Sequence, residues 1–195
     1  MRLQVDPAGL PQENMDRDLQ LAGEVRAGTA SALLRIYGWK QPAVSIGRAQ
    51  WVEDLPADFR NGYPMVRRPT GGGAVLHDPS ETTYALVLPR AACRVPLHDL
   101  PVRIHQKLFE HLRLSSFPDS DQLSLVCGNP PGPVSVCFAS PVCGDLLYRG
   151  RKTAGSAVRA WKEALLLQGS LQGLPLSSER LRTVLEQAIG KALVA

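Results

Sequence analysis

Short apolar segments with strand-like composition recur along most of the chain, and they constrain the fold more than any other feature. Residues 31–39 (SALLRIYGW) form an alternating apolar run, and residues 41–50 (QPAVSIGRAQ) form a second run that opens at Pro42 and closes at Gly47. Segments of the same kind follow at 65–78, 81–89, 137–140, 145–150, 151–161 and 163–173. Because strands joined by short turns pair in antiparallel fashion, the sequence predicts a mixed, mostly antiparallel sheet.

Three other segments have the character of amphipathic helices. Residues 14–28 carry apolar side chains at helical spacing between a capping residue, Asn14, and a terminating Gly28. Residues 101–114 and 177–193 predict two further helices. Residues 115–135 contain four prolines and several serines, which predicts a loop. The fold class is therefore α/β, of the α+β kind, with helices flanking the sheet.

The length and hydropathy of the chain limit the number of domains and the kind of protein that we expect. With 195 residues, 44% of them hydrophobic, the sequence predicts a single domain over residues 1–195. No apolar run approaches the roughly 18 to 20 residues needed to cross a bilayer, and the N-terminus lacks the apolar core of a signal peptide. We therefore expect a soluble, cytoplasmic protein with no membrane partner.

Charge and cysteine usage restrict the partners. The net charge is +4 and the arginines are scattered, which argues against nucleic acid as a partner and suits an acidic protein at least as well. The four cysteines show neither a CxxC pair nor zinc-ligand spacing. We predict free thiols and no metal site.

Three consecutive glycines, Gly71 to Gly73, follow the arginine pair Arg67 and Arg68. Without side chains in the way, backbone N–H groups at such glycines can approach a ligand closely. A glycine-rich hairpin turn is the alternative interpretation.

A second candidate site combines Lys152 with the small residues Gly155, Ser156 and Ala157. A lysine beside a glycine-lined pocket can place its ammonium against a carbonyl oxygen, a carboxyl group or a phosphate, although a solvated lysine at a strand edge is the commoner case. Cys137 stands fifteen positions earlier. It is either a buried small apolar residue or, beside a cation that favours the thiolate, a nucleophile.

Taken together, these segments resemble the family of lipoate-protein ligases and octanoyltransferases. Residues 67–78 (RRPTGGGAVLHD) look like its first signature, and residues 150–159 (GRKTAGSAVR) look like its second. The segments ENMDRDLQLA, LRIYGWKQPAVSIGRAQ and EALLLQGSL match the opening helix, the paired strands and the strand after the lysine. The resemblance runs in order from Glu13 to Leu171 and implies a biotin/lipoate-ligase type fold with a ligand tunnel.

The same resemblance implies the residues of the site. Cys137 and Lys152 are the implied catalytic pair, with Lys152 on the acyl carbonyl. The implied substrate-binding residues are Arg68, Thr70, Gly71, Gly72, Gly73, Ala74, His77, Asp145, Gly155, Ser156 and Ala157. In ATP-using members, the acid that Asp145 resembles lies near the nucleotide.

The family divides by chemistry, and the resemblance favours one branch. Many ATP-dependent ligases carry an accessory domain or need an accessory chain, whereas this sequence ends at Ala195. The octanoyltransferase branch uses a cysteine in a motif like residues 137–152, where Cys137 stands. We therefore expect octanoyl or lipoyl transfer from an octanoyl-acyl carrier protein, through a Cys137 thioester, to a lipoyl domain of a 2-oxoacid dehydrogenase or to the glycine cleavage H protein. No cofactor is required on this route.

Two alternatives remain open from the sequence. The first is a lipoate-protein ligase that uses ATP and magnesium and forms lipoyl-AMP. The second is a protein that binds an acyl group or a lipoyl domain without chemistry. The joint presence of Arg68, His77 and Lys152 argues against the second.

Overall fold

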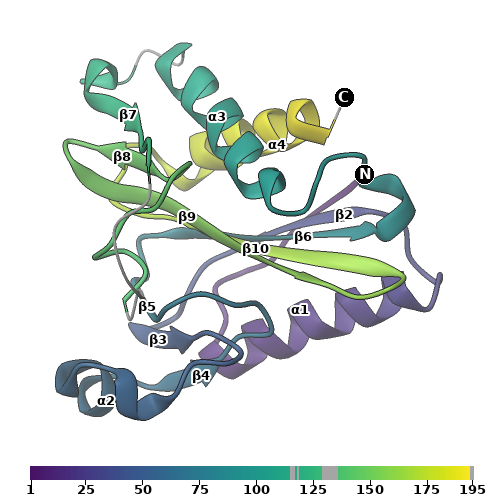
Figure 1. Cartoon of the computed structure of the whole chain (residues 1–195), viewed down its shortest axis with the longest axis horizontal. Helices are drawn as coiled ribbons and strands as arrows, with labels where there is room; N and C mark the ends of the chain where they lie inside the picture. Colours follow the sequence, from purple (N-terminus) through teal and green to yellow (C-terminus); the bar gives the residue numbers. More distant parts are fainter. Residues whose placement is uncertain (115–116, 118, 129–135, 194–195) are drawn as a thin grey trace.

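Two β-sheets organise the chain (Figure 1). The computed structural model describes residues 1–114, 117, 119–128 and 136–193. The larger sheet has seven strands in the order β1-β2-β6-β10-β9-β8-β7, and the smaller has three in the order β4-β3-β5. The strands are β1 (Arg2–Val5), β2 (Leu33–Tyr37), β3 (Ala43–Ile46), β4 (Met65–Arg67), β5 (Val75–His77), β6 (Thr82–Pro89), β7 (Leu123–Leu125), β8 (Leu146–Tyr148), β9 (Arg151–Ala160) and β10 (Ala164–Leu171). Only the pairs β1–β2 and β3–β4 are parallel among these, so the predicted mixed, mostly antiparallel sheet is confirmed.

Helices cover both faces of the larger sheet. The α-helices are α1 (Pro11–Arg26), α2 (Ala57–Gly62), α3 (Asp99–Leu114) and α4 (Ser178–Leu193), and short 3-10 turns occupy Val52–Asp54, Arg90–Ala92 and Ser120–Gln122. Figure 1 shows α3 and α4 on one face and α1 with the smaller sheet on the other. No helix in the described residues is long and apolar enough to cross a membrane.

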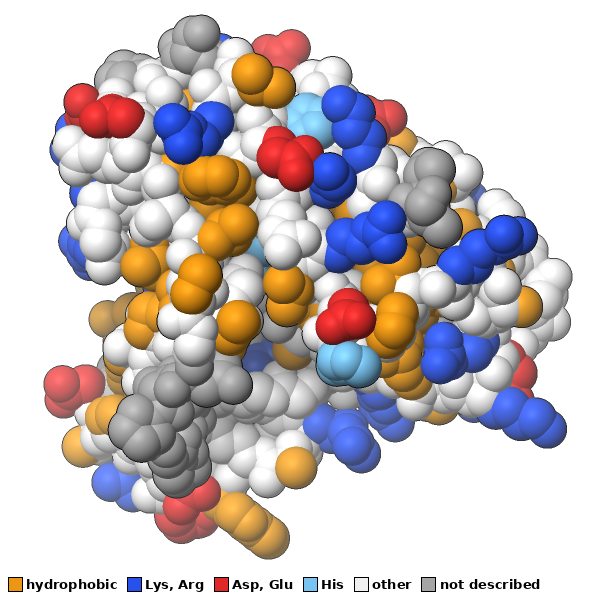
Figure 2. All heavy atoms as spheres, turned by 45° about the horizontal axis from the view of Figure 1, so that its top comes forward, with side chains coloured by type: hydrophobic (Ala, Val, Ile, Leu, Met, Phe, Trp, Pro, Cys, Tyr) orange, Lys and Arg blue, Asp and Glu red, His pale blue; other side chains and the backbone are white. Residues whose placement is uncertain are grey.

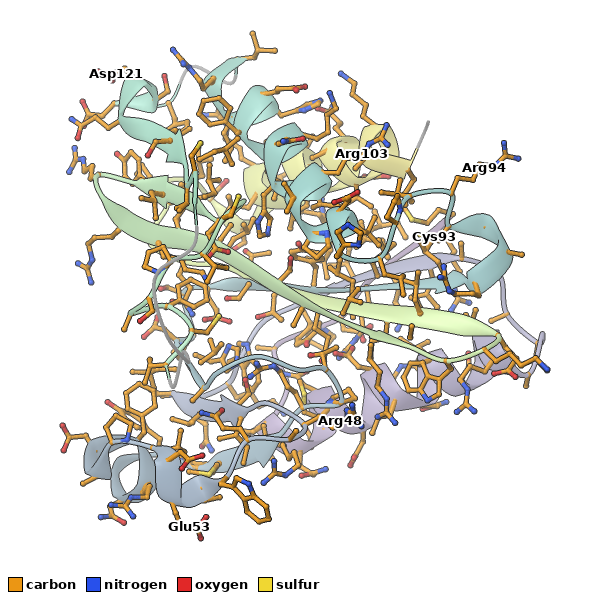
Figure 3. All side chains as sticks on the ribbon, viewed as in Figure 1. Arg48, Glu53, Cys93, Arg94, Arg103 and Asp121 are labelled. Carbon is orange, nitrogen blue, oxygen red and sulfur yellow. The ribbon has the colours of Figure 1, made fainter. Side chains whose placement is uncertain are left out.

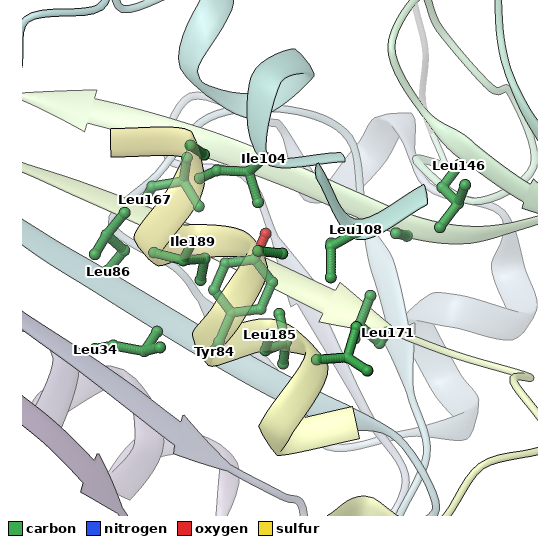
Figure 4. Packing of buried hydrophobic residues seen from close by; sticks show 14 of the residues in the cluster. Leu34, Tyr84, Leu86, Ile104, Leu108, Leu146, Leu167, Leu171, Leu185 and Ile189 are labelled. Atoms are coloured by element: carbon green, nitrogen blue, oxygen red, sulfur yellow. The ribbon is translucent and has the colours of Figure 1, made fainter. Parts of the chain in front are cut away.

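The face under α3 and α4 holds the main apolar core. Helix α3 buries Leu100, Ile104, Leu108 and Leu112, a spacing that lines one side of a helix. Figure 4 shows Tyr84 of β6 among Ile104 and Leu108 of α3 and Leu185 and Ile189 of α4. The ring of Tyr84 lies over Gly169 of β10, where an added Cβ would come within 2.3 Å of it. Glycine at this position therefore makes room for the aromatic ring in the core.

The first helix begins earlier than predicted. It starts at Pro11 rather than at Asn14, because proline suits the first helical turn and Glu13 accepts a hydrogen bond from the Leu10 N–H at 2.8 Å. Asn14 is buried within the helix and donates to the Gly38 carbonyl at 3.0 Å. The capping role assigned to Asn14 was wrong, and the residue instead ties α1 to the end of β2.

Other strand boundaries also differ from the prediction. Residues 65–78 form two strands, β4 and β5, which flank β3, so the glycines between them are no hairpin turn. Residues 137–140 form a turn instead of a strand. Within the predicted loop at 115–135, Leu123–Leu125 form β7, because alternate leucines pair with β8; residues 115–116, 118 and 129–135 of that loop lie outside the described residues. Strand β1, which carries few apolar residues, was not predicted.

The charges are distributed as the sequence indicates. Lys and Arg side chains occupy separate places on the face shown in Figure 2, with apolar and acidic side chains between them. On this face they form no continuous basic block.

Candidate functional site

A cavity of about 190 Å³ opens on the α1 side of the larger sheet. Of the residues implied by the sequence, those that line it are Arg68, Gly72, Gly73, His77, Cys137, Asp145, Lys152, Gly155, Ser156 and Ala157. The wall also includes side chains from α1, from β2 and its C-terminal flank, and from β10, among them Met15, Tyr37, Trp39 and Gln168. The structure thus gathers segments more than 100 positions apart around one space.

Lys152 stands at the centre of the polar part of the cavity. Its Nζ lies 2.6 Å from Asp145 Oδ2, 3.3 Å from Cys137 Sγ and 3.1 Å from the Cys137 carbonyl oxygen. The lysine is only 8% exposed, which excludes the solvated strand-edge interpretation. A buried ammonium shared by a carboxylate and a sulfur is placed to hold negative charge on that sulfur.

A β-bulge turns Lys152 toward the cavity. Leu147 of β8 pairs with Lys152 and Leu146 pairs with Ala154, so Thr153 is an extra residue on β9. Ala154 belongs to the core under α3 and α4. Regular alternation would place Lys152 on that same face. The bulge moves it to the opposite face, where its Cε is 2.8 Å from the position of an added Cβ at Gly155.

The turn that carries Cys137 is held against the glycine segment. The Cys137 N–H donates to the Ala74 carbonyl at 2.8 Å, and Val136 bridges to Ala74. Farther along, the Val142 N–H donates to Asp145 Oδ2 at 2.8 Å. Ala74 is not among the residues that line the cavity, and its backbone carbonyl holds the turn that carries Cys137.

Arg68 is a buried cation surrounded by neutral oxygens. Its guanidinium donates to the carbonyls of Ser45, Gly71 and Gly73 at 3.0, 2.6 and 2.8 Å. No carboxylate among the described residues forms an ion pair with it. Burial lowers the pKa of Arg68 to about 10, which leaves the group cationic at neutral pH. Its positive charge is thus buried without a paired carboxylate in the described part of the chain, and such a charge favours a polarised or negative oxygen nearby.

Gly72 has a backbone conformation that favours glycine. Its φ is +88°, and an added Cβ would lie 3.1 Å from Arg68 Nη2. Gly71, by contrast, has open space where its Cβ would be and contributes its carbonyl to Arg68. Of these two glycines, only Gly72 therefore has a conformation that favours glycine, and close approach of a ligand to the segment stays a prediction.

A hydrogen-bonded chain that the sequence did not suggest leads from Arg68 to a buried carboxylate. Arg68 Nη1 donates to Ser45 Oγ at 3.2 Å, Ser45 Oγ lies 2.7 Å from His77 Nε2, and His77 Nδ1 lies 2.6 Å from Glu81 Oε1. Because arginine only donates and a carboxylate only accepts, a neutral His77 donates from Nδ1 and accepts at Nε2. Trp39 stacks on the imidazole with centroids 3.9 Å apart.

Glu81 is the carboxylate at the end of this series of hydrogen bonds. Burial raises the pKa of this carboxyl, but His77 and the hydroxyl donors Thr83 and Ser170 outweigh burial and hold the pKa below its usual value. The carboxylate is therefore ionised at neutral pH. Neither Ser45 nor Glu81 stood out in the sequence, since each lies in or beside a strand with no motif of its own.

Thr70 lies beside the cavity and contacts its wall indirectly. Thr70 Oγ1 donates to Gln168 Oε1 at 2.8 Å, and Gln168 Nε2 donates to Asp18 Oδ2 at 2.7 Å. Asp18 pairs with Arg35 at 2.7 Å. Through this buried polar network Thr70 positions Gln168, a residue of the cavity wall, and the implied substrate-binding role of Thr70 stays a prediction.

Ser156 contacts a second histidine, His105, which the sequence predicts only as part of a helix. Ser156 Oγ lies 3.1 Å from His105 Nε2, and His105 Nδ1 lies 2.9 Å from the Gly144 carbonyl. Burial lowers the pKa of His105. One signal was available: His105 is a polar residue on the apolar side of α3, next to Ile104.

Comparison with known proteins agrees with this architecture. The family model for the lipoyl protein ligase A/B catalytic domain matches residues 10–188. Octanoyltransferase LipM of Geobacillus kaustophilus is 35% identical over 172 residues, which are 83% of this chain and 61% of that relative. Octanoyltransferase LipM of Staphylococcus aureus is 31% identical over 206 residues, or 95% of this chain and 74% of that relative. The chain spans less than two thirds of the Geobacillus protein.

Solved structures share the fold. A crystal structure of lipoate-protein ligase A bound with ATP superposes with a TM-score of 0.71 at 19% identity, covering 98% of this chain and 85% of that one. A structure from an analysis of a bipartite lipoate protein ligase and its E2 lipoyl domain from Thermoplasma acidophilum gives a TM-score of 0.66 at 18% identity, covering 98% of this chain and 83% of that one. The resemblance noted in the sequence is confirmed, and the chain belongs to the family of lipoyl protein ligase A/B catalytic domains.

Proposed function

We propose that this chain is an octanoyltransferase, which moves an octanoyl group from a carrier-protein thioester to a lysine of a lipoyl domain. One observation carries the proposal: the sulfur of Cys137 lies 3.3 Å from the buried ammonium of Lys152, in the wall of a largely apolar cavity. A nucleophilic sulfur, a fixed cation and a space for an acyl chain are the three parts that thioester exchange requires.

The reaction proceeds in two steps. The Cys137 thiolate attacks the carbonyl carbon of the octanoyl thioester, the carrier thiolate leaves, and the octanoyl group remains on Sγ. The lysine amine of the lipoyl domain then attacks this new thioester. An amide forms, and the departing Cys137 thiolate takes up the proton that the amine loses.

Three neighbouring charged groups, Lys152, Asp145 and Arg68, have different roles in this reaction. Lys152 stabilises negative charge on the sulfur and on the carbonyl oxygen of each tetrahedral state. Asp145, at 2.6 Å, fixes the lysine and balances its charge. Arg68 supplies a second buried cation in the cavity wall, beside Gly72 and Gly73.

The relatives support the same assignment. The two LipM proteins are octanoyltransferases by name and align over most of this chain. The Thermoplasma ligase is described together with its E2 lipoyl domain, which supports a lipoyl domain as acceptor. The identity of the donor rests on the chemistry of Cys137.

An ATP-dependent lipoate ligase is the second candidate, because a ligase of this fold was crystallised with ATP. Arg68 and Lys152 suit an acyl phosphate as well as a thioester oxygen, since both are fixed buried cations. Such a reaction joins a carboxylate to a nucleotide and has no step for a thiol. The role of Cys137 therefore separates the two candidates.

The experiment uses a pair of serine variants. Cys137→Ser and the control Cys143→Ser, whose cysteine is exposed, are incubated with octanoyl-carrier protein and an apo lipoyl domain without ATP. Mass spectrometry follows one octanoyl adduct on the enzyme and one on the lipoyl domain. We expect Cys137→Ser to form neither and Cys143→Ser to form both, because a serine hydroxyl is a far weaker nucleophile without a base.

The opposite pattern identifies the ligase. If Cys137→Ser modifies the lipoyl domain as fast as the natural protein, the thioester mechanism is wrong. Modification that appears only with lipoate, ATP and magnesium assigns the chain to ATP-dependent ligation.

A further inference from the structure

One strand carries a row of residues from the cavity to the surface. Gly155 and Ala157 of β9 line the cavity. Side chains two positions apart lie on the same face of a strand, so Arg159 and then Trp161, just beyond the strand end, continue this row. Trp161 packs against the core on the α1 side, which confirms the face. The cavity wall therefore leads directly to Arg159.

Arg159 is one of three cations that converge from three segments. Arg48 follows β3, Arg26 ends α1, and Arg159 belongs to β9. Figure 3 shows Arg48 on the same side of the larger sheet as α1. Partial burial, together with the charges of Arg48 and Arg26, lowers the pKa of Arg159. The guanidinium groups of Arg26 and Arg159 share the ring of Trp161, and Arg48 is near enough for its charge to act on Arg159.

This positive charge is weakly balanced by the protein. Within the described chain, Arg26 has one carboxylate partner, Glu163, at 3.8 Å, and neither Arg48 nor Arg159 has any. Like charges gathered without counter-charges destabilise a protein slightly and favour binding of an anion.

Contacts within the protein hold these arginines in place. The guanidinium groups of Arg159 and Arg26 lie 4.4 and 5.1 Å from the centroid of the Trp161 ring. The loop that presents Arg48 is fastened by Arg67, which donates to the carbonyls of Gly47, Arg48 and Gln50. The Arg48 N–H also donates to the Thr70 carbonyl at 2.8 Å, beside the glycine segment. The cluster is fixed relative to the cavity.

From this arrangement we infer that Arg48 and Arg159, supported by Arg26, bind the phosphate ester of the acyl donor. The inference rests on the proposed function and adds a recognition site to it. An acyl group delivered by a carrier protein hangs from a pantetheine arm that ends in a phosphodiester. Arginine binds such a phosphate with two parallel hydrogen bonds and a full charge.

The length of the arm agrees with this placement. Arg159 lies four residues beyond Gly155, the glycine against Lys152, which corresponds to about 13 Å along an extended strand. The arm has about 13 bonds between sulfur and phosphorus. A peptide backbone of roughly four residues has about as many bonds, so the extended arm reaches about 14 Å. One extended arm is therefore long enough to place its thioester at Cys137 and its phosphate at Arg159.

The test compares two donors that differ only in the phosphate. Octanoyl-phosphopantetheine and octanoyl-pantetheine are given separately to the natural protein, to Arg48→Gln, to Arg159→Gln and to the control Arg2→Gln on edge strand β1. Formation of the acyl-enzyme is timed by intact mass spectrometry. Binding of phosphopantetheine and of pantetheine without an acyl group is measured by calorimetry as a readout that needs no transfer.

We expect each cluster variant to raise KM for the phosphorylated donor by about 10-fold or more, since a charged hydrogen-bonded pair contributes about 1.5–3 kcal/mol. KM for octanoyl-pantetheine should not change, which also shows that the variants fold. The Arg2→Gln control should behave as the natural protein with both donors.

Two results would overturn the inference. One is a natural protein that does not distinguish phosphopantetheine from pantetheine in either assay. The other is variants that lose affinity for ATP but keep the natural KM for the phosphorylated donor, which would assign the arginines to a nucleotide. If phosphate-dependent binding is present and no acyl-enzyme forms, the phosphate site stands and the proposed transfer chemistry is wrong.

Discussion

On one face of the larger sheet, Leu108 and Leu112 of α3 and Leu185 of α4 pack against β6 and β10 in an apolar core. On the opposite face, the cavity is bordered by paired polar groups: Arg68 with its carbonyls, Lys152 with Asp145, and His77 with Glu81. Apolar packing is non-directional and tolerates exchange of similar side chains, whereas buried polar groups need particular partners. We therefore expect substitutions on the first face to change stability and those on the second to change chemistry.

The largest effect is expected from Leu108→Ala in the apolar core. Loss of a fully buried leucine leaves a cavity and should lower the free energy of unfolding by about 2–5 kcal/mol, as urea denaturation measures it. Leu114→Ala, in the same helix but 81% exposed, should change it by less than about 0.5 kcal/mol. The comparison of the two faces fails if Leu108→Ala lowers the transfer rate per folded molecule as strongly as substitutions at the cavity do.

Lys152→Ala should abolish transfer, with a loss of at least about 100-fold, because it removes the fixed cation at the reacting carbonyl. Circular dichroism should show an intact fold. Lys162→Ala, an exposed lysine of the β9–β10 turn, is the control and should keep full activity.

Removal of Lys152 also leaves Asp145 buried without its cation. The double variant Lys152→Ala with Asp145→Asn removes that uncompensated charge and should recover stability without recovering transfer. Full activity in a folded Lys152→Ala protein would exclude the lysine from the mechanism.

Gly72→Val should raise the KM for the acyl donor and lower the free energy of unfolding by about 1–3 kcal/mol, because a β-branched side chain is strained at positive φ and would crowd Arg68. Gly71→Val is the matched control, since its Cβ meets open space. Steady-state kinetics and urea denaturation of both variants test this. Normal donor binding by Gly72→Val would mean that the glycine segment does not line the acyl site.

The smallest effect should be a pH dependence of stability that arises from His105. This residue of α3 contacts Ser156, which lines the cavity, and so links the two faces of the sheet. Burial lowers the pKa of this histidine in the folded protein, so the unfolded chain binds the proton more readily. Stability should decrease as pH falls below the unfolded value of about 6.5. His105→Gln should flatten this slope in urea denaturation between pH 7.5 and 5.5, whereas His98→Gln, an exposed control, should leave it unchanged.

The sequence predicts the apolar face of the larger sheet better than the cavity face. Helix α3 was predicted over 101–114 and spans Asp99–Leu114, and helix α4 was predicted over 177–193 and spans Ser178–Leu193. Both bury an apolar side, so their periodicity is visible in the sequence. The turn at residues 137–140 was wrongly predicted as a strand, because the apolar character of Cys137 and Phe138 comes from lining the cavity and not from lying in a sheet.

Of the candidate site, the residues within the two signatures could be proposed from the sequence, and most of them line the cavity. Thr70, Gly71 and Ala74 act through hydrogen bonds from just outside it. Ser45 and Glu81 were not proposed, since several of their partners come from other segments of the chain and neither residue belongs to a motif. His105 was not proposed either, although its place on the apolar side of α3 was a signal, because its partners Ser156 and Gly144 are 51 and 39 positions away.

By itself, the sequence determined the strand-rich α+β architecture, the amphipathic helices and the local glycine chemistry, since these depend on neighbouring residues and on hydrophobic periodicity. The tertiary structure alone decided which way Lys152 points. Alternation would have turned it into the apolar core beside Ala154, and the bulge at Thr153 turns it toward Cys137 and Asp145. A bulge depends on pairing with β8, so one strand read in isolation does not contain the information.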